Sequence, residues 1–124
     1  MDNKLNSGVL FRNTKKQSEK HPDYKFITFI RQNLGAVCMT EFRFHPVRRW
    51  RADYCINPVT DKIIVEVEGG AWTLGRHTRG AGFVADMEKY NEATRLGYRV
   101  IRVTPDDLLS AKTLNLIKDL INAK

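Results

Sequence analysis

The chain has 124 residues, of which 42% are hydrophobic and 28% are charged. This length allows one compact domain with a hydrophobic core, and the composition excludes a wholly disordered chain. The longest apolar runs are only a few residues, so the sequence predicts neither a transmembrane helix nor a membrane partner. The opening residues, MDNKLNSGV, lack the apolar stretch of a secretory signal. Cys38 and Cys55 form no CxxC pair, and we therefore expect a reducing, cytoplasmic environment.

The charge is distributed unevenly. The formal net charge is +7, and residues 1–51 account for all of it with eleven basic and four acidic residues. An excess of this size favours an anionic partner, and nucleic acid is the commonest. A basic arm that only aids solubility explains the charge equally well.

The chain divides into a tail and one domain. Residues 1–22 are polar without sustained periodicity, which predicts a basic N-terminal arm followed by a single domain over 23–124. The domain opens with a predicted helix that has Asp23 as a candidate N-cap and stops at Gly35. Its apolar positions at helical spacing are Tyr24, Ile27, Phe29, Ile30 and Leu34.

Strands and helices then follow in a mixed order. We predict strands over 37–44, 50–56 and 62–68, a helix over 83–96, a strand over 98–103 and a closing helical region. Met87, Tyr90 and Thr94 form one stripe of the second helix, and Thr104 and Pro105 are the expected N-cap and first residue of the closing helix. This order predicts an α/β fold with a mixed central sheet flanked by helices.

Acidic residues recur on consecutive predicted strands. In KIIVEVE, over 62–68, alternation places Glu66 and Glu68 on one face, about 7 Å apart. Asp53 lies on the preceding strand and Glu41 on the strand before that, so the four carboxylates can converge. Oxygen ligands of this kind suit Mg²⁺ or Mn²⁺, which support phosphodiester hydrolysis. An amphipathic strand at a sheet surface would show the same EVE pattern.

A long loop, GGAWTLGRHTRGAG, follows the acidic strand. Its glycines would let the backbone approach a phosphate, and the forks of Arg76 and Arg79 would bind one bidentately. The unperturbed pKa of histidine lies near physiological pH, so His77 is a candidate proton shuttle, ligand or nucleic-acid contact. A flexible, solvated loop is the alternative.

A second basic segment, HPVRRWR, connects the first two predicted strands. Arg48, Arg49 and Arg51 surround Trp50, which suggests phosphate contacts together with base stacking on the indole. Strand alternation places Trp50 on the face opposite Arg51 and Asp53, so a core position for Trp50 is at least as well supported. The cysteine and histidine spacings match no zinc pattern.

Several blocks together resemble a known superfamily. The stretches EFRFHPVRRWRADY, IIVEVEGGAW, GRHTRGAGF, DMEKYNEA and GYRVIRVT resemble small phage and bacterial endonuclease-like domains of the PD-(D/E)XK nuclease superfamily, near its very-short-patch-repair-like and VRR-NUC-like branches. The similarity covers about residues 40–105. It implies a restriction-endonuclease-like core in which Asp53 and Glu66 are metal ligands and Glu41 is the upstream acid that completes the site.

One position departs from the superfamily motif. Where the motif has a lysine two residues after Glu66, this chain has Glu68. Lys89 could replace the lysine from the following helix, or Glu68 could act as a metal ligand or base. The expected activity is a Mg²⁺- or Mn²⁺-dependent deoxyribonuclease in a bacterial or phage-infected cell, forming a homodimer if both DNA strands are cut. The alternatives are a non-catalytic nucleic-acid-binding module and a phage regulatory protein on the same fold.

Overall fold

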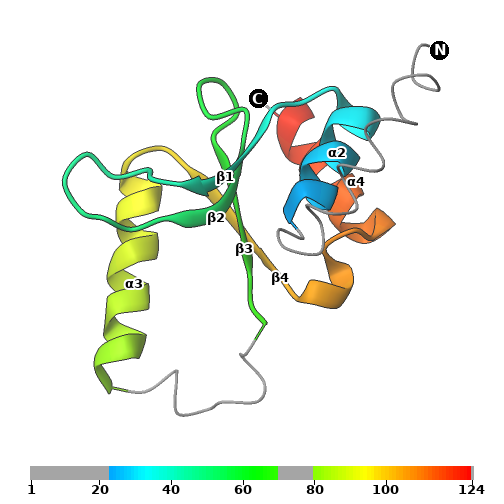
Figure 1. The fold of residues 1–124 in the computed structure, drawn as a ribbon. Helices are drawn as coiled ribbons and strands as arrows, with labels where there is room; N and C mark the ends of the chain where they lie inside the picture. The colour runs from blue at the N-terminus through cyan, green and yellow to red at the C-terminus, as the bar shows by residue number, and fades with distance from the viewer. Residues whose placement is uncertain (1–22, 70–79, 124) are drawn as a thin grey trace.

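A computed structural model describes residues 23–69 and 80–123 of the chain. Three layers are visible, with a sheet lying between α3 on one side and α2 and α4 on the other (Figure 1). The elements are α2 (Asp23–Leu34), β1 (Cys38–Phe42), β2 (Ala52–Ile56), β3 (Ile63–Val67), α3 (Gly80–Arg95), β4 (Arg99–Val103), a short 3-10 helix η2 (Pro105–Asp107) and α4 (Ala111–Asn122). The predicted α/β class and the predicted order of elements are confirmed.

The sheet is mixed, with the strand order β1-β2-β3-β4. The pairs β1/β2 and β2/β3 are antiparallel, and the turn between β2 and β3 brings Tyr54 opposite Val65. The pair β3/β4 is parallel and is joined through α3, with Glu66 opposite Arg102. β3 therefore has a neighbouring strand on each side, as its β-branched sequence predicts.

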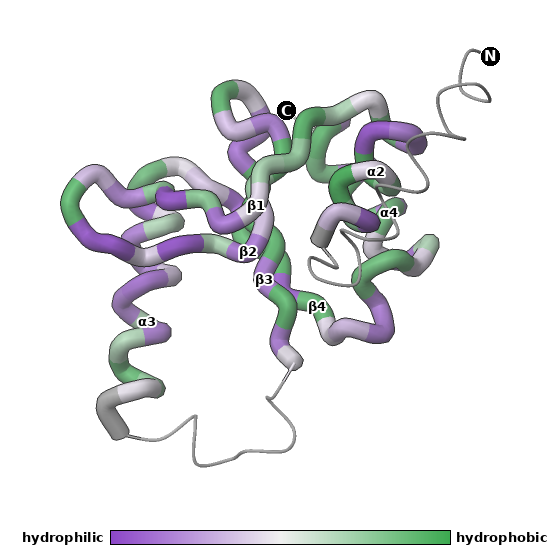
Figure 2. Tube along the Cα trace, in the orientation of Figure 1, coloured by the Kyte–Doolittle hydropathy of each residue, from purple (hydrophilic) through white to green (hydrophobic). Residues whose placement is uncertain are grey.

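Each face of the sheet has its own hydrophobic cluster. Against α2 and α4, Ile63 and Val65 of β3 are fully buried together with Phe26, Ile30 and Ile117 of the helices. The face toward α3 carries a smaller cluster, which consists of Phe44, Ala52, Cys55, Ile64 and Ala93. Figure 2 shows the contrast between hydrophobic β3 and the largely hydrophilic segment between β1 and β2. The hydrophobic cluster on the sheet face toward α3 is therefore smaller than the cluster on the face toward α2 and α4.

The first helix follows its predicted bounds. It begins at Asp23 and ends at Leu34, and Gly35 has a φ of 62° and donates its N–H to the carbonyl of Arg31 at 2.9 Å. Glycine adopts this left-handed conformation without steric penalty, which explains the stop. Phe26, which the predicted apolar set omits, is fully buried one turn before Ile30.

The predicted Thr104 cap and Pro105 start are confirmed, but the closing helical region consists of two helices with separate caps. Thr104 caps the 3-10 helix by accepting from the N–H of Asp107, and Pro105 is its first residue. Ser110 then accepts from the N–H of Thr113 and starts α4. This second cap satisfies free N–H groups at the start of α4, so a separate helix begins there.

Of the predicted stripe of α3, which is Met87, Tyr90 and Thr94, only Tyr90 is half-buried. Met87 is 46% exposed and Thr94 is exposed, whereas Ala93 is buried and Lys89 is half-buried. Lys89 of α3 thus lies against the sheet, where its charge faces the carboxylate of Glu66. None of the helices within 23–69 and 80–123 is long and apolar enough to cross a bilayer.

Candidate functional site

Glu66 is the central feature of the face toward α3. Its strand is flanked on both sides, and the residue is only 7% exposed. Within the described part of the chain, its Oε2 atom is buried without a hydrogen-bond partner. A buried oxygen of this kind is costly unless a cation or a proton compensates it.

Lys89 of α3 provides the nearest positive charge. Its Nζ lies 3.3 Å from Oε2 of Glu66, at ion-pair distance but not in hydrogen-bond geometry. The ammonium group instead donates a hydrogen bond to the carbonyl oxygen of Arg51 at 2.9 Å. Lys89 therefore links α3 to the start of β2 and places its charge beside Glu66. The predicted proximity of Lys89 to the motif carboxylate is present.

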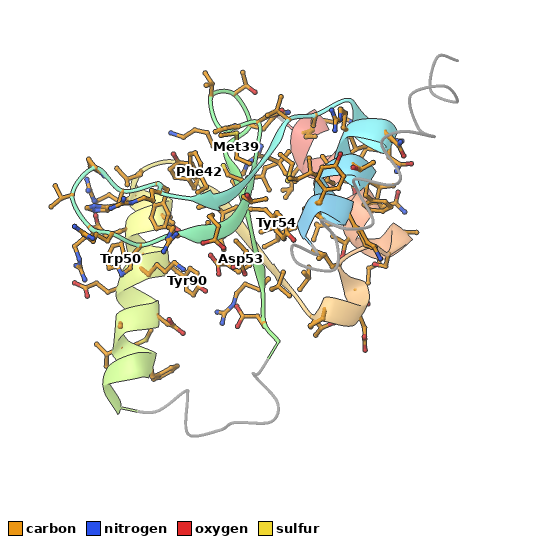
Figure 3. All side chains as sticks on the ribbon, viewed as in Figure 1. Met39, Phe42, Trp50, Asp53, Tyr54 and Tyr90 are labelled. Atoms are coloured by element: carbon orange, nitrogen blue, oxygen red, sulfur yellow. The ribbon has the colours of Figure 1, made fainter. Side chains whose placement is uncertain are left out.

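Asp53 lies on the neighbouring strand. It precedes Tyr54, whose ring packs against Phe26 on the α2 side, so Asp53 points toward α3 (Figure 3). Its Oδ2 accepts a hydrogen bond from the backbone N–H of Val67 at 2.8 Å. This bond fixes the carboxylate at the end of β3. Asp53 is also close enough to raise the pKa of Glu66 through charge repulsion.

The environment favours the protonated form of Glu66. Burial raises its pKa from 4.5 to about 7, and the charges of Asp53 and Glu68 act in the same direction. The positive charge of Lys89 opposes them but does not cancel them. Glu66 therefore exchanges its proton near neutral pH, and a bound cation would favour its charged form.

Glu68 shares the face of Glu66, as alternation predicts, but it is already paired. Its Oε2 accepts from Nε of Arg102 on β4 at 2.8 Å. The guanidinium carbon of Arg102 lies 4.8 Å from the ring centroid of Tyr90, which extends from α3 toward the sheet (Figure 3). Burial and the charges of Glu66 and Glu68 raise the pKa of Tyr90, so its hydroxyl keeps its proton.

Sequence reasoning did not identify Arg102 or Tyr90 as site residues. A charged residue inside the apolar strand RVIRV is a usable signal for Arg102, but its position beside Glu66 requires the parallel pairing of β3 and β4. The sequence pattern puts Tyr90 on a helix stripe, but its approach to the carboxylates depends on how α3 lies on the sheet.

Glu41, the expected upstream acid, lies in a different environment. It has a φ of 49° and its carboxylate forms an ion pair with Arg51 at 3.2 Å, with both side chains more than half exposed. Across residues 23–69 and 80–123, no three histidine, cysteine or acidic side chains gather as a set of metal ligands. The carboxylates of Asp53 and Glu66 are thus the pair that the fold brings together on the α3 side.

The segment between β1 and β2 carries the other predicted DNA contacts. Arg48 lies 3.9 Å from the ring centroid of Trp50 and pairs with Glu88 of α3 at 3.3 Å, while Arg49 is exposed. Phe44 also stacks on the indole, with ring centroids 6.2 Å apart. The half-buried Trp50 is thus engaged by packing, which favours its core interpretation over base stacking.

His45 holds this segment against α3. Its Nδ1 accepts from the backbone N–H groups of Val47 and Arg48, and its Nε2 lies 2.9 Å from Glu92. Two donors directed at Nδ1 require the proton to be on Nε2, which therefore donates to Glu92. Hydrogen bonds from Arg95 and His45 lower the pKa of Glu92 to about 2. The predicted contacts Arg76, His77 and Arg79 lie outside the described residues.

Comparisons with family models, with curated proteins and with solved structures gave no match to this chain.

Proposed function

We propose that the protein is a divalent-metal-dependent deoxyribonuclease with a restriction-endonuclease-like core, and that it hydrolyses phosphodiester bonds at Asp53 and Glu66. The observation that carries the proposal is the buried carboxylate of Glu66 on β3, next to the carboxylate of Asp53. Its Oε2 accepts no hydrogen bond among the described residues and lies 3.3 Å from Nζ of Lys89. A carboxylate buried in this way is a frequent mark of a functional site. The sequence resemblance assigns the same two residues to metal binding.

The two carboxylates fit the proposed ion. Mg²⁺ commonly binds one or two protein carboxylates and completes its octahedral shell with water and substrate phosphate. Asp53 and Glu66 would hold it, and Glu66 would lose its proton on binding. When bound, the ion supplies activation of water and neutralisation of phosphate charge.

Other side chains have separate roles in the proposal. Lys89 places a positive charge beside Glu66, where it would stabilise negative charge that develops on the phosphate. Arg48, Arg49 and Arg51 lie on the segment that leads directly into β2, so they would hold the DNA backbone near Asp53.

A cleavage assay tests the proposal. Labelled single-stranded, duplex and branched DNA are incubated with the protein in Mg²⁺, Mn²⁺ or EDTA. We expect cutting in either metal, none in EDTA, and loss of cutting in both Asp53→Asn and Glu66→Gln. Asp119→Asn, which neutralises an exposed carboxyl on α4, is the matched control and should cut normally. Cutting that survives in Glu66→Gln, or that does not require metal, would refute the proposed site.

Metal binding can be measured without activity. Mg²⁺ or Mn²⁺ should raise the melting temperature of the parent protein and of Asp119→Asn, because a ligand of the folded state stabilises it. The increase should disappear in Asp53→Asn and Glu66→Gln. An equal increase in all four proteins would place the metal elsewhere.

A non-catalytic DNA-binding protein is the second candidate. One observation favours it, since the ammonium group of Lys89 already lies 3.3 Å from Glu66 and can compensate the buried charge without a metal. Such a protein would shift DNA equally in Mg²⁺ and in EDTA, and would do so after either substitution. It would cut none of the substrates.

A further inference from the structure

Arg102 occupies a defined position beside the two carboxylates. It lies opposite Glu66 in the parallel pairing of β3 and β4, and paired residues project from the same face of a sheet. Its Nε donates to Glu68 at 2.8 Å, and its guanidinium group lies 4.8 Å from the Tyr90 ring centroid. The contacts with Glu68 and with Tyr90 of α3 thus restrain the guanidinium group.

The terminal nitrogens of Arg102 are not used by these contacts. Its hydrogen bond to Glu68 comes from Nε, and Nη1 and Nη2 have no hydrogen-bond acceptor among the described residues. The side chain is 51% exposed, so these donors reach solvent. The hydrogen bond that Arg102 donates to Glu68 raises the pKa of Arg102 still further, and the group remains charged at all relevant pH values.

We propose that Arg102 binds a backbone phosphate of DNA next to the Asp53 and Glu66 carboxylates. A guanidinium fork offers two parallel N–H donors, which match two phosphate oxygens. The hydrogen bond from Nε to Glu68 and the contact with the Tyr90 ring restrain the Arg102 side chain before DNA binds, so less conformational freedom is lost on binding. The inference rests on the proposed function for its choice of DNA as the ligand.

The competing explanation is a purely structural ion pair between Arg102 and Glu68. A pair in which the side chains are 51% and 27% exposed contributes little to stability, about 1 kcal/mol or less. A structural pair would also commonly use Nη donors in a bidentate contact with the carboxylate. Here Nε alone bonds Glu68, which leaves the fork available to a ligand.

The test measures DNA binding in EDTA, so that its result does not depend on cleavage. A labelled oligonucleotide is titrated with the parent protein, Arg102→Gln, Arg102→Lys, Glu68→Gln and Arg31→Gln at several salt concentrations. Arg31 is an exposed arginine on α2, across the sheet from the site, and is the matched control for charge. Circular dichroism and thermal melting report whether each variant is folded.

Arg102→Gln should weaken binding about tenfold. The slope of log affinity against log salt should become shallower by about 0.9 for duplex DNA, or about 0.7 for single strands. Arg102→Lys should keep the salt slope but bind less tightly than the parent, because a point charge replaces the fork. Glu68→Gln should bind at least as tightly as the parent, since the amide oxygen still accepts the orienting hydrogen bond from Nε of Arg102 while a negative charge near the phosphate is removed.

The results separate this inference from the proposed function. If Arg102→Gln binds like Arg31→Gln with an unchanged salt slope, or if the parent protein binds no DNA, the inference is overturned. If binding depends on Arg102 while no metal-dependent cutting occurs, the phosphate contact stands and the nuclease proposal fails. If Arg102→Gln does not fold, the affinities and salt slopes of Arg102→Lys and Glu68→Gln decide whether Arg102 contacts phosphate. Weaker DNA binding by Glu68→Gln would refute the contact.

Discussion

The buried carboxyl of Glu66 predicts an unusual pH dependence of stability. Its pKa is about 7 in the folded protein and near 4.5 in an exposed chain. Between these values the folded protein keeps a proton that the unfolded chain releases. The free energy of unfolding therefore falls as pH rises from about 4.5 to about 7 and levels off above that range. One pKa unit corresponds to about 1.4 kcal/mol, so the loss from Glu66 is about 3 kcal/mol.

Glu66→Gln isolates this contribution because glutamine has a similar shape and does not titrate. Urea unfolding is measured in EDTA from pH 4 to pH 8 for the parent protein, Glu66→Gln and Asp119→Asn. The parent should lose about 3 kcal/mol more than Glu66→Gln over this range, and Asp119→Asn should follow the parent. The histidines are present in all three proteins, so the difference between the curves removes any contribution from them.

Parallel curves for the parent and Glu66→Gln would refute the reasoning, since they would mean that Glu66 has the same pKa in the folded and unfolded states. A parent that gains stability as pH rises, relative to Glu66→Gln, would show that Lys89 dominates over burial. Either result would remove the physical argument that this carboxylate requires compensation.

Three further predictions concern separate parts of the fold. Lys89→Met should move the pH-dependent loss of stability to higher pH, as measured by urea midpoints, because Lys89 lowers the pKa of Glu66. Cys55, whose pKa burial raises to about 12, should resist iodoacetamide at pH 8 in the folded protein and react in urea, as peptide mapping would show. Phe26→Ala should lower the free energy of unfolding by about 3–5 kcal/mol, whereas Val59→Ala, at an 89% exposed position, should change it by less than about 0.5 kcal/mol; equal losses would contradict the assigned core.

Local patterns determined much of the fold. The β-branched run of β3, the glycines after α2 and α3 and the alternation of KIIVEVE each depend on neighbouring residues, and the structure follows them. The sequence prediction differed from the structure where two nearby residues could each start a helix. Thr104 and Ser110 are both competent N-caps, and the chain uses both of them.

Some features of the candidate site follow from the local sequence, and others follow only from tertiary packing. The sequence determined that Glu66 and Glu68 share a face and that Asp53 lies on an adjacent strand, because alternation and a short turn act over a few residues. The tertiary structure alone decided that Arg102 lies beside Glu66 and that Glu41 pairs with Arg51, and it places Lys89, which the resemblance suggested, 3.3 Å from Glu66. The contacts of Arg102 and Lys89 depend on the parallel pairing of β3 with β4 and on the position of α3 on the sheet, whereas the Glu41–Arg51 pair depends on the antiparallel pairing of β1 with β2. Packing between segments that are separated in the sequence sets these strand pairings and the position of α3, and no local pattern encodes them.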